Sequence, residues 1–242
     1  MEWFFDLKRD FILCFIEEER WLYLANGLVN TLRITSLAVL MGIAIGIVVA
    51  VIRVSYDQNS AEMHGAGKVL LTIANAVSHL YLAVIRGTPV VVQLMIAYYI
   101  IFASSRNGVA VATLAFGINS GAYVAEIFRS GIMSINEGPF EAGRALGFSY
   151  VTTMQYIVVP QAFKNVLPAL ANEFIVLLKE TSVAGYVTVR DLTMGGDIIR
   201  SVTYSPFLPL LAVAAIYLAM VLFFTWLVGK LEKKLHSTEK RG

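Results

Sequence analysis

The residues best suited to chemistry in this sequence are ionisable side chains that stand inside long apolar stretches. Glu126 and Arg129 are three positions apart, so on a helix they share a face and can neutralise each other. Glu173 differs, because no basic residue lies three or four positions from it. A lone carboxylate within a membrane costs roughly 2.5–3.5 kcal/mol and needs a partner on another helix, a water-filled cavity or a bound cationic group. Glu173 is therefore the strongest candidate for a ligand-binding group.

Other kinds of chemistry have little support in the sequence. The three histidines, His64, His79 and His236, lack metal-ligand spacing, and a single cysteine, Cys14, cannot form an intrachain disulfide. Residues 65–68 approach a phosphate-binding loop, but they lack its first glycine and the Ser or Thr after the lysine. Neither a nucleophile–base pair nor a metal constellation is present near the apolar stretches. We expect no enzyme activity, metal or cofactor in this chain.

The stretches that must position these side chains are long enough to cross a bilayer. Of the 242 residues 57% are hydrophobic and 15% charged, whereas soluble domains carry about a quarter charged residues. Four runs contain no charge at all: 34–52, 87–105, 107–125 and 201–229. An α-helix needs about 20 apolar residues to cross the hydrocarbon core. A domain of this size cannot bury four such runs, so the sequence predicts an all-α integral membrane protein.

We expect about five transmembrane helices, near residues 26–52, 86–105, 108–128, 168–189 and 207–229. The first contains Gly42 and Gly46, whose spacing lets two helices approach closely. The fourth has the weakest support because it contains three charges, Glu173, Lys179 and Glu180.

The stretch 69–105 is interrupted by one charge, Arg86, and is too long for a single span. It holds either two spans or a surface helix followed by one span. Asn75, Ser78 and His79 form a polar stripe at helical spacing, which favours a surface helix for the first half. Arg86 would then begin the second span, where it either extends toward lipid phosphate or has a functional role.

Charge bias predicts the orientation. Residues 1–25 contain six acids and three basic residues, whereas the tail 231–242 has more basic than acidic residues. Because Lys and Arg are in excess on the cytoplasmic side, the N-terminal amphipathic segment is expected outside and the tail inside. Residues 129–167 would then form a cytoplasmic loop, and Asp191, Asp197 and Arg200 a solvated loop outside. If 69–105 held two spans, the N-terminus would move inside.

The cytoplasmic loop contains the most informative pattern, over residues 136–160. Pro139 stands where the first turn of a helix tolerates proline, and Gly147 where a left-handed residue would end that helix. Ser149 can cap a second short helix, which Pro160 would end. The loop could therefore present small side chains (Ala142, Gly143, Ala145) to another protein, or it could simply lie on the bilayer.

This loop resembles the EAA loop of ABC-importer permeases, whose pattern is Glu-Ala-Ala-x-x-x-Gly and, later, Ile-x-Leu-Pro. The sequence here reads Glu141-Ala142-Gly143, then Gly147, then Ile157-Val158-Val159-Pro160. Glycine replaces the second alanine and valine replaces leucine. In that family the loop docks into a groove on a cytoplasmic ATPase. The resemblance implies this coupling role for Glu141, Ala142, Gly143, Arg144, Ala145, Leu146 and Gly147.

Further segments resemble permeases of the polar amino acid uptake branch: Asn30-Thr31-Leu32, Arg86-Gly87-Thr88-Pro89, Gln93-Leu94, the stretch 121–132 and Leu177-Leu178-Lys179-Glu180-Thr181-Ser182. Together they cover about residues 26–230, which would form an ABC type-1 transmembrane domain in a bacterial plasma (inner) membrane. The resemblance implies an amino acid importer that works by alternating access. Its implied partners are an ATPase dimer that binds ATP and Mg, a second permease protomer, identical or similar, and an extracytoplasmic solute-binding protein, with no nucleic acid.

In such a permease Glu173 would face the translocation cavity, where a zwitterionic or basic amino acid supplies the cationic group. The candidate substrate path comprises Thr88, Gln93, Glu126, Asn172, Glu173, Lys179, Glu180, Thr181 and Ser182. One alternative is the same class of permease for a sulfonate, an opine or a peptide. A less favoured alternative is a secondary transporter, which usually contains inverted repeats that this sequence does not display.

Overall fold

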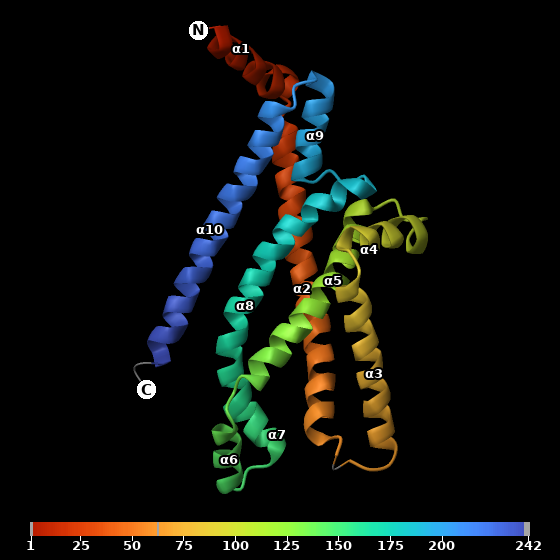
Figure 1. The fold of residues 1–242 in the computed structure, drawn as a ribbon, viewed down its shortest axis with the longest axis vertical. Helices are drawn as coiled ribbons and strands as arrows, with labels where there is room; N and C mark the ends of the chain where they lie inside the picture. Colours follow the sequence, from red (N-terminus) through yellow and green to blue (C-terminus); the bar gives the residue numbers. More distant parts are fainter. Residues whose placement is uncertain (1, 62, 240–242) are drawn as a thin grey trace. The chain divides into compact units, whose positions relative to one another are not determined.

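The chain is helical almost throughout. The computed structural model describes residues 2–61 and 63–239, and within these ranges there is no strand (Figure 1). Four helices are long and apolar enough to cross a bilayer: α2 (Trp21–Asn59), α3 (Ala66–Gly87), α5 (Gly108–Met133) and α10 (Phe207–Glu239). A fifth helix, α8 (Val159–Glu180), has 22 residues and is about 33 Å long, but it is more polar. The predicted all-α membrane fold is confirmed.

The second span begins earlier than the sequence suggested. The apolar helix that follows α3 ends at Ile101 and starts at Val90, so it is only about 18 Å long, too short to cross a bilayer. Asn75 and Ser78 are buried against the protein, which accounts for two members of the polar stripe on α3, whereas His79 is exposed. The surface-helix interpretation is therefore wrong, and α3 itself is the second of about five spans. It ends at Gly87 because Pro89 keeps the preceding residue extended.

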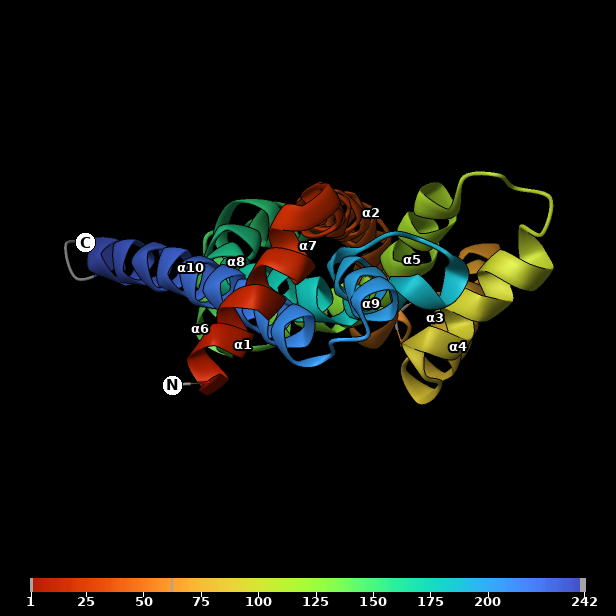
Figure 2. The ribbon, with the colours of Figure 1, turned by 90° about the horizontal axis from the view of Figure 1, so that it is seen from above.

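The described residues form two compact units, of which the first comprises residues 2–38, 89–116 and 174–226. It contains α1 (Glu2–Phe11), the start of α2, α4 (Val90–Ile96), η3 (Ala97–Ile101), η5 (Thr181–Val187), α9 (Leu192–Thr203) and most of α10. Figure 2 shows α9 next to η5, and the two are in contact. α9 also packs closely on α2, since a Cβ added at Gly195 would lie 2.4 Å from the Tyr23 carbonyl oxygen.

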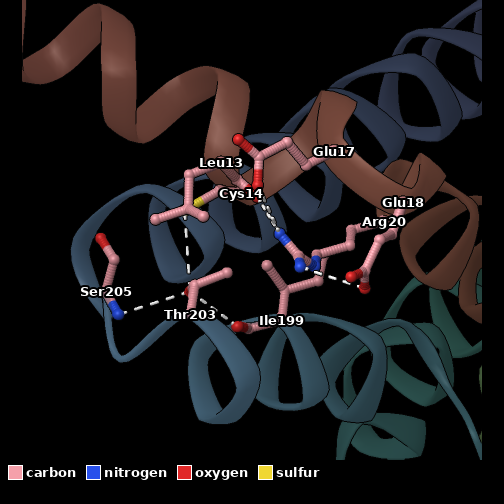
Figure 3. Close-up of polar contacts among 8 residues, drawn as sticks. All are labelled: Leu13, Cys14, Glu17, Glu18, Arg20, Ile199, Thr203 and Ser205. Atoms are coloured by element: carbon pink, nitrogen blue, oxygen red, sulfur yellow. Dashed lines mark hydrogen bonds and ion pairs between the residues drawn. The ribbon is translucent and has the colours of Figure 1, made fainter.

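The segment before α2 is held by polar contacts within itself and by a contact with α9 (Figure 3). Arg20 is buried; its guanidinium donates to the Leu13 carbonyl oxygen and lies 3.1 Å from a Glu18 carboxylate oxygen. The thiol of Cys14 donates to the Thr203 hydroxyl over 3.8 Å. Cys14 also belongs to the apolar core of this unit, together with residues of α9 and α10. The N-terminal segment is thus an integral part of the first unit.

The second unit comprises residues 39–88, 117–173 and 227–239. It contains the remainder of α2 and α5, α3, α6 (Glu137–Ala145), α7 (Tyr150–Thr153), η4 (Met154–Val158) and the first part of α8. Here α2 and α5 approach closely, since a Cβ added at Gly42 would lie 2.9 Å from the Ser120 side chain and one at Gly46 would lie 2.5 Å from that of Val124. The predicted close packing at this glycine pair is confirmed.

Candidate functional site

The loop between α5 and α8 folds into two short helices. α6 begins after Asn136 with Pro139 in its first turn, and it ends at Ala145, two residues before Gly147, whose φ is +76°. The Gly147 N–H donates to the Arg144 carbonyl over 2.9 Å, and the Phe148 N–H donates to the Gly143 carbonyl over 3.0 Å. These two bonds form a Schellman motif, which favours glycine at the left-handed position. The predicted beginning and end of this helix are confirmed.

The second short helix, α7, is capped as predicted but does not end as predicted. The Ser149 hydroxyl accepts a hydrogen bond from the Thr152 N–H over 3.2 Å. The chain then passes through the π-helical turn η4 directly into α8, so Pro160 is the second residue of a new helix rather than the end of the previous one. A proline ring clashes with the carbonyl four residues earlier in a regular helix, and the wider π turn relieves that clash. The predicted stop at Pro160 is wrong.

Most of the predicted coupling residues face outward. Glu141, Ala142, Arg144, Ala145, Leu146 and Gly147 are exposed. Gly143 is buried instead, because a Cβ there would lie 2.4 Å from Thr153 Oγ1. The predicted small-residue face is thus split, with Gly143 packed inward on α7 and the two alanines accessible.

The loop is also joined to the end of α2. The Tyr150 hydroxyl donates to the Gln58 side-chain oxygen, and burial raises the pKa of Tyr150 above its ordinary value, so it remains a donor at neutral pH. Exposed apolar side chains continue from Leu146 to Val151 and Tyr156. Such a surface can bind a partner through both apolar and charged contacts.

A groove with a volume of about 540 Å³ lies between α5 and α8 in the second unit. Glu126 and Glu173 both line it, together with Tyr123, Asn165 and neighbouring small residues. Glu173 is only 8% exposed and accepts a hydrogen bond from the Ser120 hydroxyl over 2.9 Å. The groove therefore contains two carboxylates from different helices.

The two carboxylates differ in their electrostatic surroundings. Glu126 lies 3.1 Å from the Arg129 guanidinium, which confirms the predicted pairing, and 3.9 Å from the Arg86 guanidinium. Arg86 also lies over the Tyr123 ring, 5.7 Å from its centroid, so protein groups hold it at the end of α3. The negative charge of Glu126 is thus balanced by neighbouring cations. Glu173 is instead buried, with the Ser120 hydroxyl donating to its carboxylate.

The remaining candidates for the substrate path are distributed over both units. Thr88 and exposed Asn172 belong to the second unit, as do the two carboxylates. Gln93, Lys179, Glu180, Thr181 and Ser182 belong to the first unit. Thr181 is fully buried and donates to the Leu178 carbonyl over 2.8 Å, so its hydroxyl serves the fold locally. Among these candidates, Glu126 and Glu173 share the groove between α5 and α8.

Asp191 was expected in a solvated loop, but it is completely buried. Its carboxylate caps α9 by accepting hydrogen bonds from the N–H groups of Met194, over 3.0 Å, and Thr193, over 3.2 Å. Burial raises its pKa to about 6, and the two backbone hydrogen bonds counteract part of that effect. An Asp before an apolar helical stretch is a recognised cap signal that the sequence offered. The hydrogen bond from Ser120 to Glu173 had no such local signal.

The family model and the similar proteins all match this chain to transport permeases. The family described as the inner membrane component of binding-protein-dependent transport systems matches residues 66–237. A putative glutamine transport system permease of Rickettsia typhi is 35% identical over 88% of this chain and 93% of its own length. An arginine transport system permease of Bacillus subtilis is 33% identical over 90% of this chain and 94% of its own.

The solved structures similar to this chain are also transporters. An amino acid ABC transporter crystallised with histidines is 38% identical to this chain, with a TM-score of 0.79 over 91% of this chain and 98% of that one. An inward-facing methionine ABC transporter, 19% identical with a TM-score of 0.73 over 90% of this chain and 98% of that one, shares the fold.

Proposed function

Because the chain belongs to the family of inner membrane components of binding-protein-dependent transport systems, we propose that it is the permease subunit of an ATP-driven importer of polar amino acids. The observation that best supports the substrate class is the groove containing Glu173, whose buried carboxylate suits the ammonium group of an amino acid. Similarity to glutamine and arginine permeases points the same way. Family membership favours this function over a secondary transporter.

The proposed mechanism is alternating access driven by a separate ATPase dimer, which binds ATP and Mg. The exposed residues of α6 dock on that ATPase, and closure of the dimer moves the loop. This chain does no covalent chemistry; it shifts between two helix packings that bind the solute differently. Half of the pathway comes from a second protomer, identical or similar. A solute-binding protein delivers the amino acid from outside, where the N-terminus lies.

The domain assignment follows from this mechanism. Residues 26–230 act as the ABC type-1 transmembrane domain, preceded by an extracytoplasmic segment and followed by a basic cytoplasmic tail. The last part of that tail, residues 240–242, lies outside the described residues. The basic residues near the end of α10 support the inward orientation of the tail.

Co-purification with the ATPase, measured for variants of the loop, tests its coupling role. Gly147→Ala places a side chain at a left-handed position, where an L-residue costs roughly 1–2 kcal/mol. We expect this variant, and Glu141→Ala, to co-purify with less ATPase or to hydrolyse ATP without transport. Gly138→Ala is the matched control, because an added Cβ there meets no atom within 4 Å. Normal association and normal coupling in both loop variants would show that the loop assignment is wrong.

Uptake by the Glu173→Gln variant tests whether the groove binds the transported amino acid. Glutamine keeps the shape and accepts the Ser120 hydrogen bond but removes the charge. A hydrogen bond to a charged group contributes about 1.5–3 kcal/mol, so uptake efficiency should fall about tenfold or more. Glu232→Gln, the same change at an exposed position near the end of α10, should transport normally. An unaltered rate and substrate preference in Glu173→Gln would contradict the assignment.

A further inference from the structure

A second cavity, with a volume of about 680 Å³, lies entirely within the first unit. Two loops form most of its wall: the one before α5 and the one between η5 and α9. The residues lining it are Asn30, Tyr98, Ser105, Arg106, Asn107, Gly108, Val109, Thr188, Val189 and Arg190. The residues that line this cavity belong neither to the loop between α5 and α8 nor to the groove that contains Glu173.

The fixed charges around this cavity are positive. Arg106 and Arg190 are both exposed, and within the described residues neither forms an ion pair within 4.0 Å. The described residues that line the cavity include no acid. The first residues of α5 do line it, so the partial positive charge of a 26-residue helix adds to the two guanidiniums. Two acids, Glu18 and Glu19, line a neighbouring pocket with Arg190, where the Glu18 carboxylate pairs with Arg20.

The wall of the cavity is held by hydrogen bonds. The Asn30 side chain donates to the Arg190 carbonyl over 2.9 Å, and the hydroxyls of Tyr98 and Thr188 lie 3.1 Å apart. Thr188 has a φ of 61°, a conformation that a β-branched residue adopts only when its surroundings impose it. Asn107 accepts a hydrogen bond from the Ala110 N–H over 3.0 Å. The two arginines therefore project from a pre-organised frame, which lowers the entropic cost of binding.

We propose that this cavity receives carboxylate side chains of the solute-binding protein when that protein docks. The proposal rests on the proposed function, which supplies such a partner and places both loops outside. A guanidinium binds a carboxylate through two parallel hydrogen bonds, so two of them in one concave, acid-free wall select an acidic partner. Charges of this kind steer a partner toward its docking position and make association depend on salt.

The test uses the complete transporter, permease and ATPase together, in lipid nanodiscs with the binding protein in solution. ATP hydrolysis is measured against binding-protein concentration for the unaltered complex, for Arg106→Glu/Arg190→Glu and for Arg106→Lys/Arg190→Lys. We expect the glutamate pair to raise the half-maximal concentration at least tenfold and the lysine pair to raise it less. Arg200→Glu makes the same substitution at one exposed residue of α9, with half of the charge change of the glutamate pair; it is the control and should not shift the half-maximal concentration.

The salt dependence of the unaltered complex gives a second measurement that does not depend on variants folding. Its half-maximal concentration should rise when salt is increased from low to physiological ionic strength, because exposed charge pairs are screened. A salt-independent value would overturn the proposal, as would a glutamate pair that behaves like Arg200→Glu. A lower maximal rate at an unchanged half-maximal concentration would also overturn it, since the cavity would then act on the solute. Absence of any stimulation in the unaltered complex would instead contradict the proposed function.

Discussion

Replacing Gly143 with alanine should weaken the association of this chain with its ATPase, although alanine is the residue that the EAA pattern has at this position. The added Cβ would lie 2.4 Å from Thr153 Oγ1 and 2.6 Å from Thr153 Cγ2, far inside ordinary contact distance. Thr153 is 2% exposed, so its side chain cannot turn into solvent. α6 would have to move away from α7, and the exposed residues that we propose to dock on the ATPase would move with it.

The structure also gives the size of the effect and the change that should reverse it. Extra atoms in a packed contact cost about 1–3 kcal/mol, which corresponds to a roughly 5- to 150-fold loss of affinity if docking carries the whole cost. Thr153→Ala removes both colliding atoms. Within the described residues Thr153 Oγ1 has no hydrogen-bond partner, so its removal alone should change little. The double variant should therefore bind the ATPase nearly as well as the unaltered chain.

The assay is a four-way comparison of ATPase affinity in detergent: the unaltered chain, each single variant and the double variant. The coupling energy of the cycle measures the clash directly. Wild-type affinity in Gly143→Ala would refute the reasoning, because α6 would then tolerate the extra methyl group. A double variant as weak as Gly143→Ala would refute it as well, since the defect would have a cause other than Thr153.

Two further predictions concern the first unit. Gly27→Ala puts a Cβ 2.5 Å from the Asp191 carbonyl oxygen, a backbone atom that cannot rotate away, so we expect a loss of at least about 2 kcal/mol and a melting temperature lower by several degrees. Gly229→Ala, with no atom within 4 Å of the added Cβ, should melt normally; equal melting of the two would contradict the packing. Since the raised pKa of Asp191 means that the folded state binds its proton more tightly, the stability of the α9 cap should fall as pH rises from about 4 to about 6 and then level off. The protection of the Met194 amide from hydrogen exchange, corrected for intrinsic rates, should show this pH dependence. The pH dependence should disappear in Asp191→Asn.

Local signals allowed the loop to be predicted well from the sequence. Pro139, Gly147 and Ser149 each act through their own backbone geometry or through a cap within three residues, so nearby residues determine the outcome. The pairing of Glu126 with Arg129 was accessible for the same reason. Contacts between distant segments were not accessible, because no local pattern specifies which helix Glu173 will face.

The errors have physical causes as well. A polar stripe on a helix shows that one face avoids lipid, but Asn75 and Ser78 demonstrate that the face can turn toward protein as well as toward water. Asp191 was assigned to a solvated loop because it follows the predicted fourth span, whereas its role as a helix cap keeps it buried. The π turn before Pro160 accommodates the proline ring, which a regular helix cannot do without a clash.

The burial of Cys14 makes the natural sequence a convenient background for spectroscopic labelling. The chain has one cysteine, and its thiol is fully enclosed between the N-terminal segment and α9. A cysteine introduced at an exposed position, such as Leu146 on the loop or Tyr204 after α9, would be the accessible thiol for a maleimide reagent. Spin labels or fluorophores at two such positions could then follow distances through the ATP cycle in a protein that otherwise keeps its native residues.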